Sequence, residues 1–343
     1  MNPPLVSILI PAFNAEEWIA STIRSALKQT WERKEIIVVD DGSTDRTLAI
    51  AREFESDGVL VVEQKNQGAS TARNKAFSLS HGDFIQWLDA DDILGPDKIR
   101  RQLEALGPTT GGRILLSSSW GHFMYRPHRA RFIPTALWCD LSPAEFLLRK
   151  LEQRVFMQTA VWLMSRELAR TAGPWDTSIT LDDDGEYFCR VLLASDGVRF
   201  VPEARVYYRL VGSASLSYVG RSNQKLESLW RSIQLHIQYT RSLGDNERVR
   251  CACVSYLQSY LISFDPLRPD IVKQMHLLAQ DLGRRLDTPS LPRKYFWIQR
   301  LVGLGRAKGA QLFLRRVKFW FIRSWDRLAD RVERRRLTVD FGA

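Results

Sequence analysis

The feature that most constrains the fold is an alternation of short apolar runs with segments of helical periodicity over the first hundred residues. The apolar runs cover residues 6–10, 36–39, 59–62 and 84–88 and predict four buried strands. The segments between them predict three helices, of which the last covers residues 69–79. We expect Asn14, with Glu17 three residues later, to cap the first helix and Ser43 to cap the second. Strands that alternate with helices indicate βαβ units and a parallel sheet, so the sequence predicts an α/β fold.

Acidic residues follow the carboxyl ends of two predicted strands, which is where parallel sheets bind their ligands. Asp40 and Asp41 follow the second strand, and one of them is a candidate acceptor for a ring N–H of a ligand. The structural alternative for this pair is a turn with a helix cap. Asp89, Asp91 and Asp92 follow the fourth strand, and a solvated turn is the alternative for them. Carboxylates this close raise one another's pKa unless a cation lies among them, and oxygen ligands suit Mg²⁺ or Mn²⁺.

The pattern changes after a break rich in Gly, Pro and Thr at residues 107–112. The later part of the chain predicts strands at residues 114–116, 159–164 and 199–201, helices from Ser142 and over 184–194, and helices throughout from about Gly220.

A third acidic cluster lies where the helix over residues 184–194 begins. It comprises Asp182, Asp183, Asp184 and Glu186. Acids at a helix N-terminus are stabilised by the helix dipole, which is the structural interpretation. Four acids in five positions exceed what a cap needs, so one of them is a candidate general base that deprotonates an acceptor hydroxyl.

Several segments together resemble the donor-site motifs of family 2 glycosyltransferases. The motif segments are residues 6–14, 38–45, 66–74 and 88–92, and the similarity continues through residues 173–176 and 183–191 to about residue 217. The resemblance implies a GT-A fold, with a Rossmann-like, mostly parallel sheet flanked by helices and a C-terminal helical extension. It also implies an inverting transfer from an α-linked nucleotide-diphosphate sugar. A Gln-x-x-Arg-Trp motif is not in the sequence, which disfavours a processive polymer synthase.

The resemblance also implies roles for individual residues. The donor-binding positions are Pro11, Phe13, Asn14, Asp40, Arg73, Asp89, Asp91 and Arg209. Asp89 and Asp91 match the family's Asp-x-Asp, which holds the diphosphate through a divalent metal, Mn²⁺ or Mg²⁺, and Asp92 is a candidate to share that metal. Arg209 is a candidate diphosphate contact, or alternatively a member of a surface salt bridge.

The resemblance matches Asp184 to the family's catalytic base. Asp183 stands where the family usually has Glu, which shortens the side chain by one methylene group. The assignment of the base among Asp182, Asp183 and Asp184 therefore stays open at this point.

The net charge of +10 is concentrated near the C-terminus. Residues 284–336 hold 16 Lys and Arg against 4 Asp and Glu, which indicates an anionic partner surface. An apolar stripe at helical spacing runs through Leu314, Val317, Phe321, Trp325, Leu328 and Val332, with arginines on the opposite face. The stripe packs on the body of the protein in one interpretation, and lies on anionic lipid in a second. Nucleic-acid binding is a third alternative, which the sequence disfavours because nothing matches a recognised binding module.

The sequence predicts three parts and a compartment. We expect a glycosyltransferase domain over residues 1–217, with a donor half over 1–106 and an acceptor half over 107–217, then a helical extension over 218–290 and a basic amphipathic tail over 291–343. No run of about 18 apolar residues is present, the first apolar run is too short for a signal peptide, and the four cysteines are scattered. These features favour the reducing cytoplasm, with peripheral attachment at the inner face of the cell membrane as an option.

The function that these observations favour is a non-processive, metal-dependent, inverting glycosyl transfer in cell-envelope or surface-polysaccharide synthesis. Its partners are a nucleotide-diphosphate sugar donor and a saccharide or lipid-linked acceptor. Two other classes stay open: an inactive nucleotide-sugar-binding scaffold of the same fold, and a nucleic-acid-binding protein that uses the basic tail.

Overall fold

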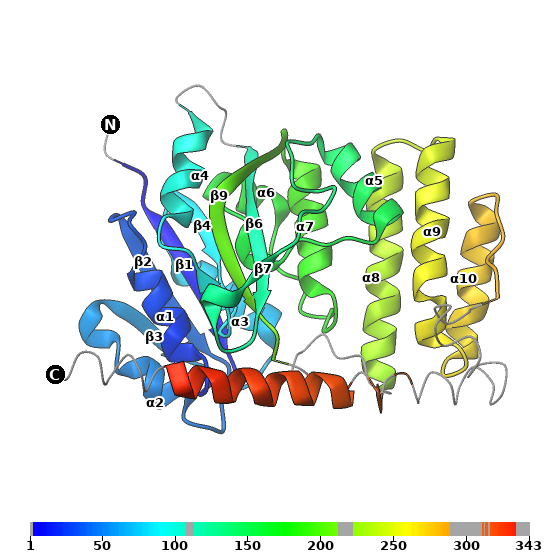
Figure 1. The fold of residues 1–343 in the computed structure, drawn as a ribbon. Helices are drawn as coiled ribbons and strands as arrows, with labels where there is room; N and C mark the ends of the chain where they lie inside the picture. The colour runs from blue at the N-terminus through cyan, green and yellow to red at the C-terminus, as the bar shows by residue number, and fades with distance from the viewer. Residues whose placement is uncertain are drawn as a thin grey trace.

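The computed structural model describes most of the chain. The described residues are 3–107, 113–211, 222–288, 311, 313–314 and 316–333. Two sheets and their helices form the first two thirds of the molecule, three long helices stand side by side next to them, and the final helix runs along one edge (Figure 1).

The larger sheet is mostly parallel, as the sequence predicts. Its strands are β1 (Val6–Ala12), β2 (Lys34–Asp40), β3 (Val59–Glu63), β4 (Phe84–Trp87) and β8 (Met164–Ser165), in the order β3-β2-β1-β4-β8. Only β8 is antiparallel to its neighbour. Every residue of β1 is buried, because helices cover both faces of such a sheet. The register pairs Ala12 with Asp40, so the loops after β1 and β2 lie next to each other.

Helices α1 (Ile19–Leu27), α2 (Thr47–Arg52) and α3 (Ala69–Leu79) accompany this sheet, whereas α4 (Lys98–Leu106) packs mainly on the second sheet. Helix α3 has the predicted bounds, but both predicted caps are wrong. Trp18 and Arg46 occupy the cap positions of α1 and α2. Asn14 has a positive φ of 47°, and its side-chain oxygen accepts a hydrogen bond from the backbone N–H of Thr44 at 2.8 Å. The side chain that was expected to cap a helix thus joins the two loops.

A second sheet contains β5 (Ile93–Leu94), β6 (Ile114–Phe123), β7 (Arg131–Phe132) and β9 (Gly197–Arg209), in the order β5-β9-β6-β7. β6 and β9 are parallel and extend well beyond the short strands that the sequence predicts. The strand predicted at residues 159–164 is wrong over its first half, which is a 3-10 helix, Thr159–Val161. The Gln158 side chain causes this turn, because it accepts a hydrogen bond from the backbone N–H of Ala160 at 2.7 Å.

The remaining helices are α5 (Pro143–Gln153), α6 (Arg166–Ala172), α7 (Asp183–Ala194), α8 (Asn223–Ser242), α9 (Glu247–Phe264) and α10 (Pro269–Asp281). The buried apolar residues form two clusters, one around the two sheets and one around α8, α9 and α10. Leu148 and Leu151 of α5 belong to the second cluster, so α5 connects the sheets to the three long helices.

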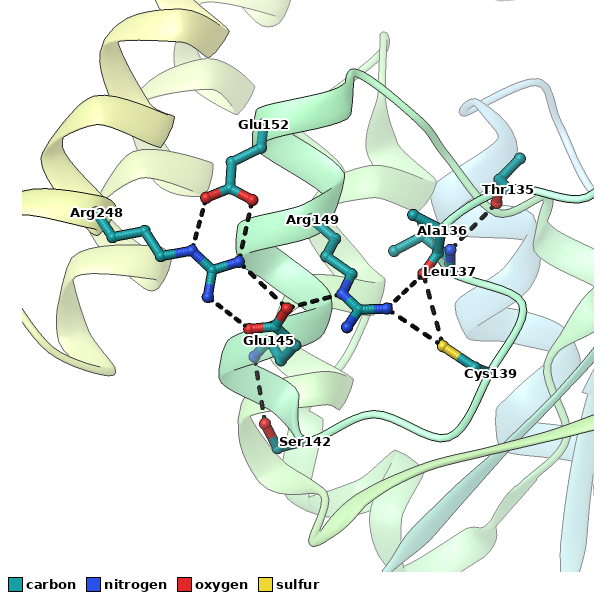
Figure 2. Close-up of polar contacts among 9 residues, drawn as sticks. All are labelled: Thr135, Ala136, Leu137, Cys139, Ser142, Glu145, Arg149, Glu152 and Arg248. Atoms are coloured by element: carbon teal, nitrogen blue, oxygen red, sulfur yellow. Dashed lines mark hydrogen bonds and ion pairs between the residues drawn. The ribbon is translucent and has the colours of Figure 1, made fainter.

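Charged side chains strengthen the contact between α5 and α9 (Figure 2). Arg248 of α9 donates hydrogen bonds to Glu145 and Glu152 of α5, with closest distances of 2.8 Å to each. Arg149 donates to the same Glu145 at 2.7 Å and to the backbone oxygen of Ala136 at 3.1 Å. These hydrogen bonds, from Arg248 and then Arg149, lower the pKa of Glu145 to about 2. The predicted start of this helix at Ser142 is confirmed, and the Ser142 side chain caps α5 by accepting a hydrogen bond from the backbone N–H of Glu145.

The described helix nearest the C-terminus keeps its apolar stripe away from the body of the protein. Residues 316–333 are helical, and their charged face contacts the body of the protein, so the interpretation in which the apolar stripe packs inward is wrong. Among the helices of the described ranges, none is long and apolar enough to cross a membrane. All four cysteines are free thiols.

Candidate active site

A buried arginine joins two of the predicted acidic clusters. Arg73 comes from α3, and its side chain is only 6% exposed. Its Nη2 donates to Asp89 Oδ1 at 2.8 Å and its Nη1 donates to Asp183 Oδ2 at 2.7 Å. Its guanidinium group also lies 4.3 Å from the centre of the Trp175 ring. The structure therefore brings together residues that are far apart in the sequence but were predicted to share one site.

Asp184 lies beside this ion pair and is partly exposed. Its Oδ2 accepts a hydrogen bond from Thr159 Oγ1 at 3.4 Å, and its Oδ1 accepts one from the backbone N–H of Gly185 at 2.9 Å. Burial and the neighbouring carboxylates of Asp183 and Asp182 raise the pKa of Asp184 to about 7. A carboxylate with such a pKa accepts protons readily near neutral pH, which is the property of a general base.

Asp91 is the second acid with a strongly raised pKa. Burial and the nearby charge of Asp89 raise the pKa of Asp91 to about 7, although Arg209 opposes the effect. A divalent cation between Asp89 and Asp91 would offset this repulsion. Within the described ranges, no group of three or more His, Cys, Asp or Glu side chains is arranged to hold a metal. Two carboxylates do fit the way in which Mg²⁺ and Mn²⁺ bind to nucleotides, because the phosphates supply further oxygen ligands.

Asp92 differs from this pair, because it is fully buried. Its Oδ2 accepts a hydrogen bond from the Gln158 side chain, and its Oδ1 accepts one from the backbone N–H of Arg209 at 2.8 Å. Both oxygens therefore have protein partners. This arrangement speaks against the expectation that Asp92 shares the metal, and it makes Asp92 a support for the loop that carries Asp91.

Arg209 is also buried, with 4% of the residue exposed. Its guanidinium group lies between the rings of Trp18 and Phe123, 4.3 and 4.4 Å from their centres. Its Nε donates to the backbone oxygen of Asp91 at 2.6 Å, and its Nη1 donates to that of Met124 at 2.9 Å. The surface salt bridge considered from the sequence is therefore wrong. The expected diphosphate contact stays a prediction, and in the structure the side chain supports the loop that carries Asp91.

Three of the predicted donor-binding residues, Pro11, Phe13 and Asp40, lie at the ends of β1 and β2. Pro11 is buried within β1, and Phe13 is 46% exposed directly after it. Asp40 is 1% exposed, and its carboxylate accepts hydrogen bonds from the backbone N–H and the hydroxyl of Ser43 at 2.9 and 2.6 Å. The turn that was the structural alternative for Asp40 is therefore present. Asp41 fixes the loop between β3 and α3, because its oxygens accept hydrogen bonds from the backbone N–H groups of residues 67 and 68.

The sequence did not reveal a buried polar cluster behind the third group of acids. Asp182 has a positive φ of 62°, and its Oδ2 accepts hydrogen bonds from Ser232 at 2.6 Å and from His236 Nε2 at 3.0 Å. His236 Nδ1 lies 3.2 Å from Cys189 Sγ and 3.3 Å from Lys150 Nζ. Burial would lower the pKa of His236, but Cys189 and Asp182 raise it to about 9. Helix α8 thus anchors Asp182, and nothing in the local sequence signals a partner 54 residues away.

Comparison with known proteins identifies the family of the first part of the chain. Residues 7–170 match the family "Glycosyl transferase family 2". These residues form a family 2 glycosyltransferase domain. Over 107 residues the chain is 39% identical to an Escherichia coli protein named UDP-Glc:alpha-D-GlcNAc-diphosphoundecaprenol beta-1,3-glucosyltransferase WfgD. The aligned region covers 31% of this chain and 42% of that protein. The alignments with this protein and with another relative of 39% identity each span less than half of the relative's length.

Solved structures share the GT-A fold with this chain. Residues 1–349 of Staphylococcus aureus TarS, in complex with UDP-GlcNAc, match with a TM-score of 0.62 at 17% identity, over 81% of each chain. The mannosyltransferase PcManGT from Pyrobaculum calidifontis, in complex with GDP-Man and Mn²⁺, matches with a TM-score of 0.52 at 18% identity, over 97% of this chain and 87% of that one. These likenesses confirm the α/β fold with a mostly parallel sheet flanked by helices.

The ion pairs of Arg73 give a prediction about stability. We expect Arg73→Ala to lower the free energy of unfolding by about 3–5 kcal/mol, because it leaves Asp89 and Asp183 without their shared cation in a poorly solvated site. The measurement is urea unfolding followed by circular dichroism. Arg52→Ala is the control, because the Arg52–Glu63 pair is 54% exposed on both sides and we expect little change. An equal effect of the two substitutions would contradict the assignment.

Proposed function

We propose that this protein is a metal-dependent, inverting glycosyltransferase that moves a sugar from a nucleotide-diphosphate donor to a hydroxyl group of an acceptor. The observation that carries the proposal is the position of a partly exposed base candidate, Asp184, near the candidate metal ligand Asp89. Arg73 links the two groups through Asp89 and Asp183. The family assignment supports the reaction class.

Asp89 and Asp91 are the residues that would hold the divalent cation, together with the donor diphosphate. The cation would offset the charge that develops on the leaving diphosphate. Two observations support the fit: the mutual repulsion of the carboxylates in the chain, and the Mn²⁺ in the related mannosyltransferase structure. Arg209 fixes the backbone of Asp91, so the ligand is oriented before the donor binds.

Asp184 is the residue that we propose as the general base. Asp183 is held by the Arg73 ion pair, and Asp182 is held by Ser232 and His236. Among the described side chains, Asp184 is the acid of this triplet without an ion pair at 4.0 Å or less. It is therefore best placed to take the proton of the acceptor hydroxyl as the sugar is attacked. Attack by an activated acceptor on an α-linked donor, without a covalent intermediate, gives the inverted β-linkage.

The acceptor that we propose is a saccharide or a lipid-linked saccharide of the cell envelope or of a surface polysaccharide. The E. coli relative is named for an acceptor on diphosphoundecaprenol, and TarS was solved with UDP-GlcNAc. Such donors are made in the cytoplasm, so we place the protein there. An inactive nucleotide-sugar-binding scaffold is the second candidate, and substitution of the base distinguishes the two.

The donor site is tested first by calorimetric titration with UDP, GDP, TDP and CDP, with and without Mn²⁺. We expect one nucleotide to bind tightly only when Mn²⁺ is present, because Asp89 and Asp91 hold the diphosphate through the cation. Asp91→Ala should abolish the metal-dependent part of this binding. Binding of a nucleotide with equal affinity in the absence of metal would contradict the metal dependence.

Substitution of the base should separate transfer from binding. We expect Asp184→Asn to reduce the transfer rate by about 10²–10⁴-fold, because a general base contributes a factor of this size. Nucleotide affinity, measured by calorimetry, should stay close to that of the parent protein. Asp196→Asn is the matched control, since Asp196 is an exposed acid paired with Arg113. Retained turnover in Asp184→Asn would move the role to Asp183, and absence of turnover in the parent protein would favour the scaffold.

The raised pKa of Asp184 predicts the pH dependence of transfer. A base acts in its deprotonated form, so kcat/KM for the acceptor should rise with pH through a midpoint near the pKa of about 7. Asp183→Asn should move this midpoint to lower pH, because it removes a negative charge that raises the pKa of Asp184. Rates at saturating donor and metal, measured from pH 5 to 9 in about half-unit steps, test both points. A midpoint that stays in place in Asp183→Asn would contradict the assignment.

A further inference from the structure

The helix over residues 316–333 contacts the glycosyltransferase domain through its charged face. Asp326 accepts a hydrogen bond from the backbone N–H of Tyr125 at 2.9 Å and pairs with Arg126 at 2.8 Å. About two helical turns further along, Glu333 pairs with the same Arg126 at 2.7 Å. Arg323 on this face donates to the Tyr125 hydroxyl at 3.1 Å. The helix therefore lies along the edge of the domain with its orientation fixed by charged contacts (Figure 1).

The opposite face of this segment is apolar and exposed. Eight of the fifteen large apolar side chains that are exposed in the described part of the chain lie between residues 313 and 332. They are Phe313, Leu314, Trp320, Phe321, Ile322, Trp325, Leu328 and Val332. Trp320 is 63% exposed, Phe321 62% and Trp325 70%. Soluble proteins rarely expose so many neighbouring apolar groups, so this face requires a partner.

We propose that this apolar face inserts into the surface of a bilayer that contains anionic lipid. Tryptophan and phenylalanine on one face of a helix, with cations beside them, are typical of helices that lie in the membrane interface. The charges of the helix favour this partner over a second copy of the chain. Asp326 and Glu333 are paired with the domain, whereas Lys318 and Arg331 are exposed beside the apolar face. The sequence continues with Arg334, Arg335 and Arg336.

The contacts of the helix also relate the bilayer to the site. Arg323 contacts Tyr125, whose ring centre lies 5.2 Å from that of Trp18. Arg209 lies over the same Trp18 ring and donates to the backbone oxygen of Asp91. The membrane-facing helix is thus a few side chains away from a candidate metal ligand. If the proposed transfer is correct, this position presents the site to an acceptor held in the bilayer, whereas membrane binding itself does not depend on the transfer.

The test is sedimentation of the full chain with lipid vesicles. We expect binding to vesicles of phosphatidylglycerol and phosphatidylcholine in equal parts, weaker binding at high salt, and little binding to phosphatidylcholine alone. The double variant Phe321→Ala and Trp325→Ala removes apolar area from the exposed face and keeps helix propensity. It should reduce vesicle affinity by about tenfold or more. Leu267→Ala with Leu277→Ala is the matched control, since both leucines are exposed elsewhere and should leave binding unchanged.

A second variant tests the charge independently of the apolar face. Lys318→Glu with Arg331→Glu keeps the apolar side chains, and we expect it to remove the preference for phosphatidylglycerol. Unchanged vesicle binding in both double variants would overturn the proposal. So would a dimer in solution that the Phe321→Ala and Trp325→Ala variant dissociates, or binding of RNA with no binding of vesicles. Calorimetry with nucleotide and Mn²⁺ on each sample reports the site separately, so failure of the proposed function is distinguishable from failure of membrane binding.

Discussion

The geometry of the site depends on one buried cation. Arg73 comes from α3 and Asp183 from the start of α7, and the ion pair between them fixes the distance between the candidate metal ligands and the candidate base. A guanidinium group in so dry a place costs much free energy unless carboxylates surround it. Asp89 and Asp183 supply them, and the face of the Trp175 ring adds a third favourable contact. Chemistry and stability are therefore coupled here, because the acids that attract Arg73 belong to the same clusters as the reactive groups.

Hydrogen bonds from neighbouring side chains hold acids of both clusters in place. Gln158 donates to Asp92, and the next residue, Thr159, donates to Asp184. One short 3-10 segment thus contacts both acidic clusters at once. His236 and Ser232 hold Asp182 in the same way from α8. These hydrogen bonds fix Asp92 and Asp182. Burial and the neighbouring carboxylates raise the pKa of Asp92 as well, and they raise the pKa values of Asp91 and Asp184 to about 7.

The parts of the fold that the sequence predicts are those that local periodicity determines. Strands β1 and β2 and helix α3 follow from apolar spacing, and the acids after β2 and β4 are placed correctly because they follow strand ends. The failures involve partners distant in sequence. Asn14 contacts Thr44 rather than its own helix, and Asp182 meets His236, 54 residues away. Arg209 was misplaced for the same reason, since its partners Asp91 and Met124 are 118 and 85 residues distant.

The C-terminal helix shows a related limit of sequence patterns. An amphipathic stripe predicts a helix with one buried face, but it does not say what buries that face. Here Arg126 decides the orientation, because Asp326 and Glu333 lie seven residues apart on the charged face and both reach it. Ion pairs at a protein surface contribute little free energy each, whereas an apolar face removed from water contributes about 25 cal/mol per Å². The charged contacts therefore select the orientation of the helix, and a bilayer that covers the aromatic face supplies most of the free energy that holds it in place.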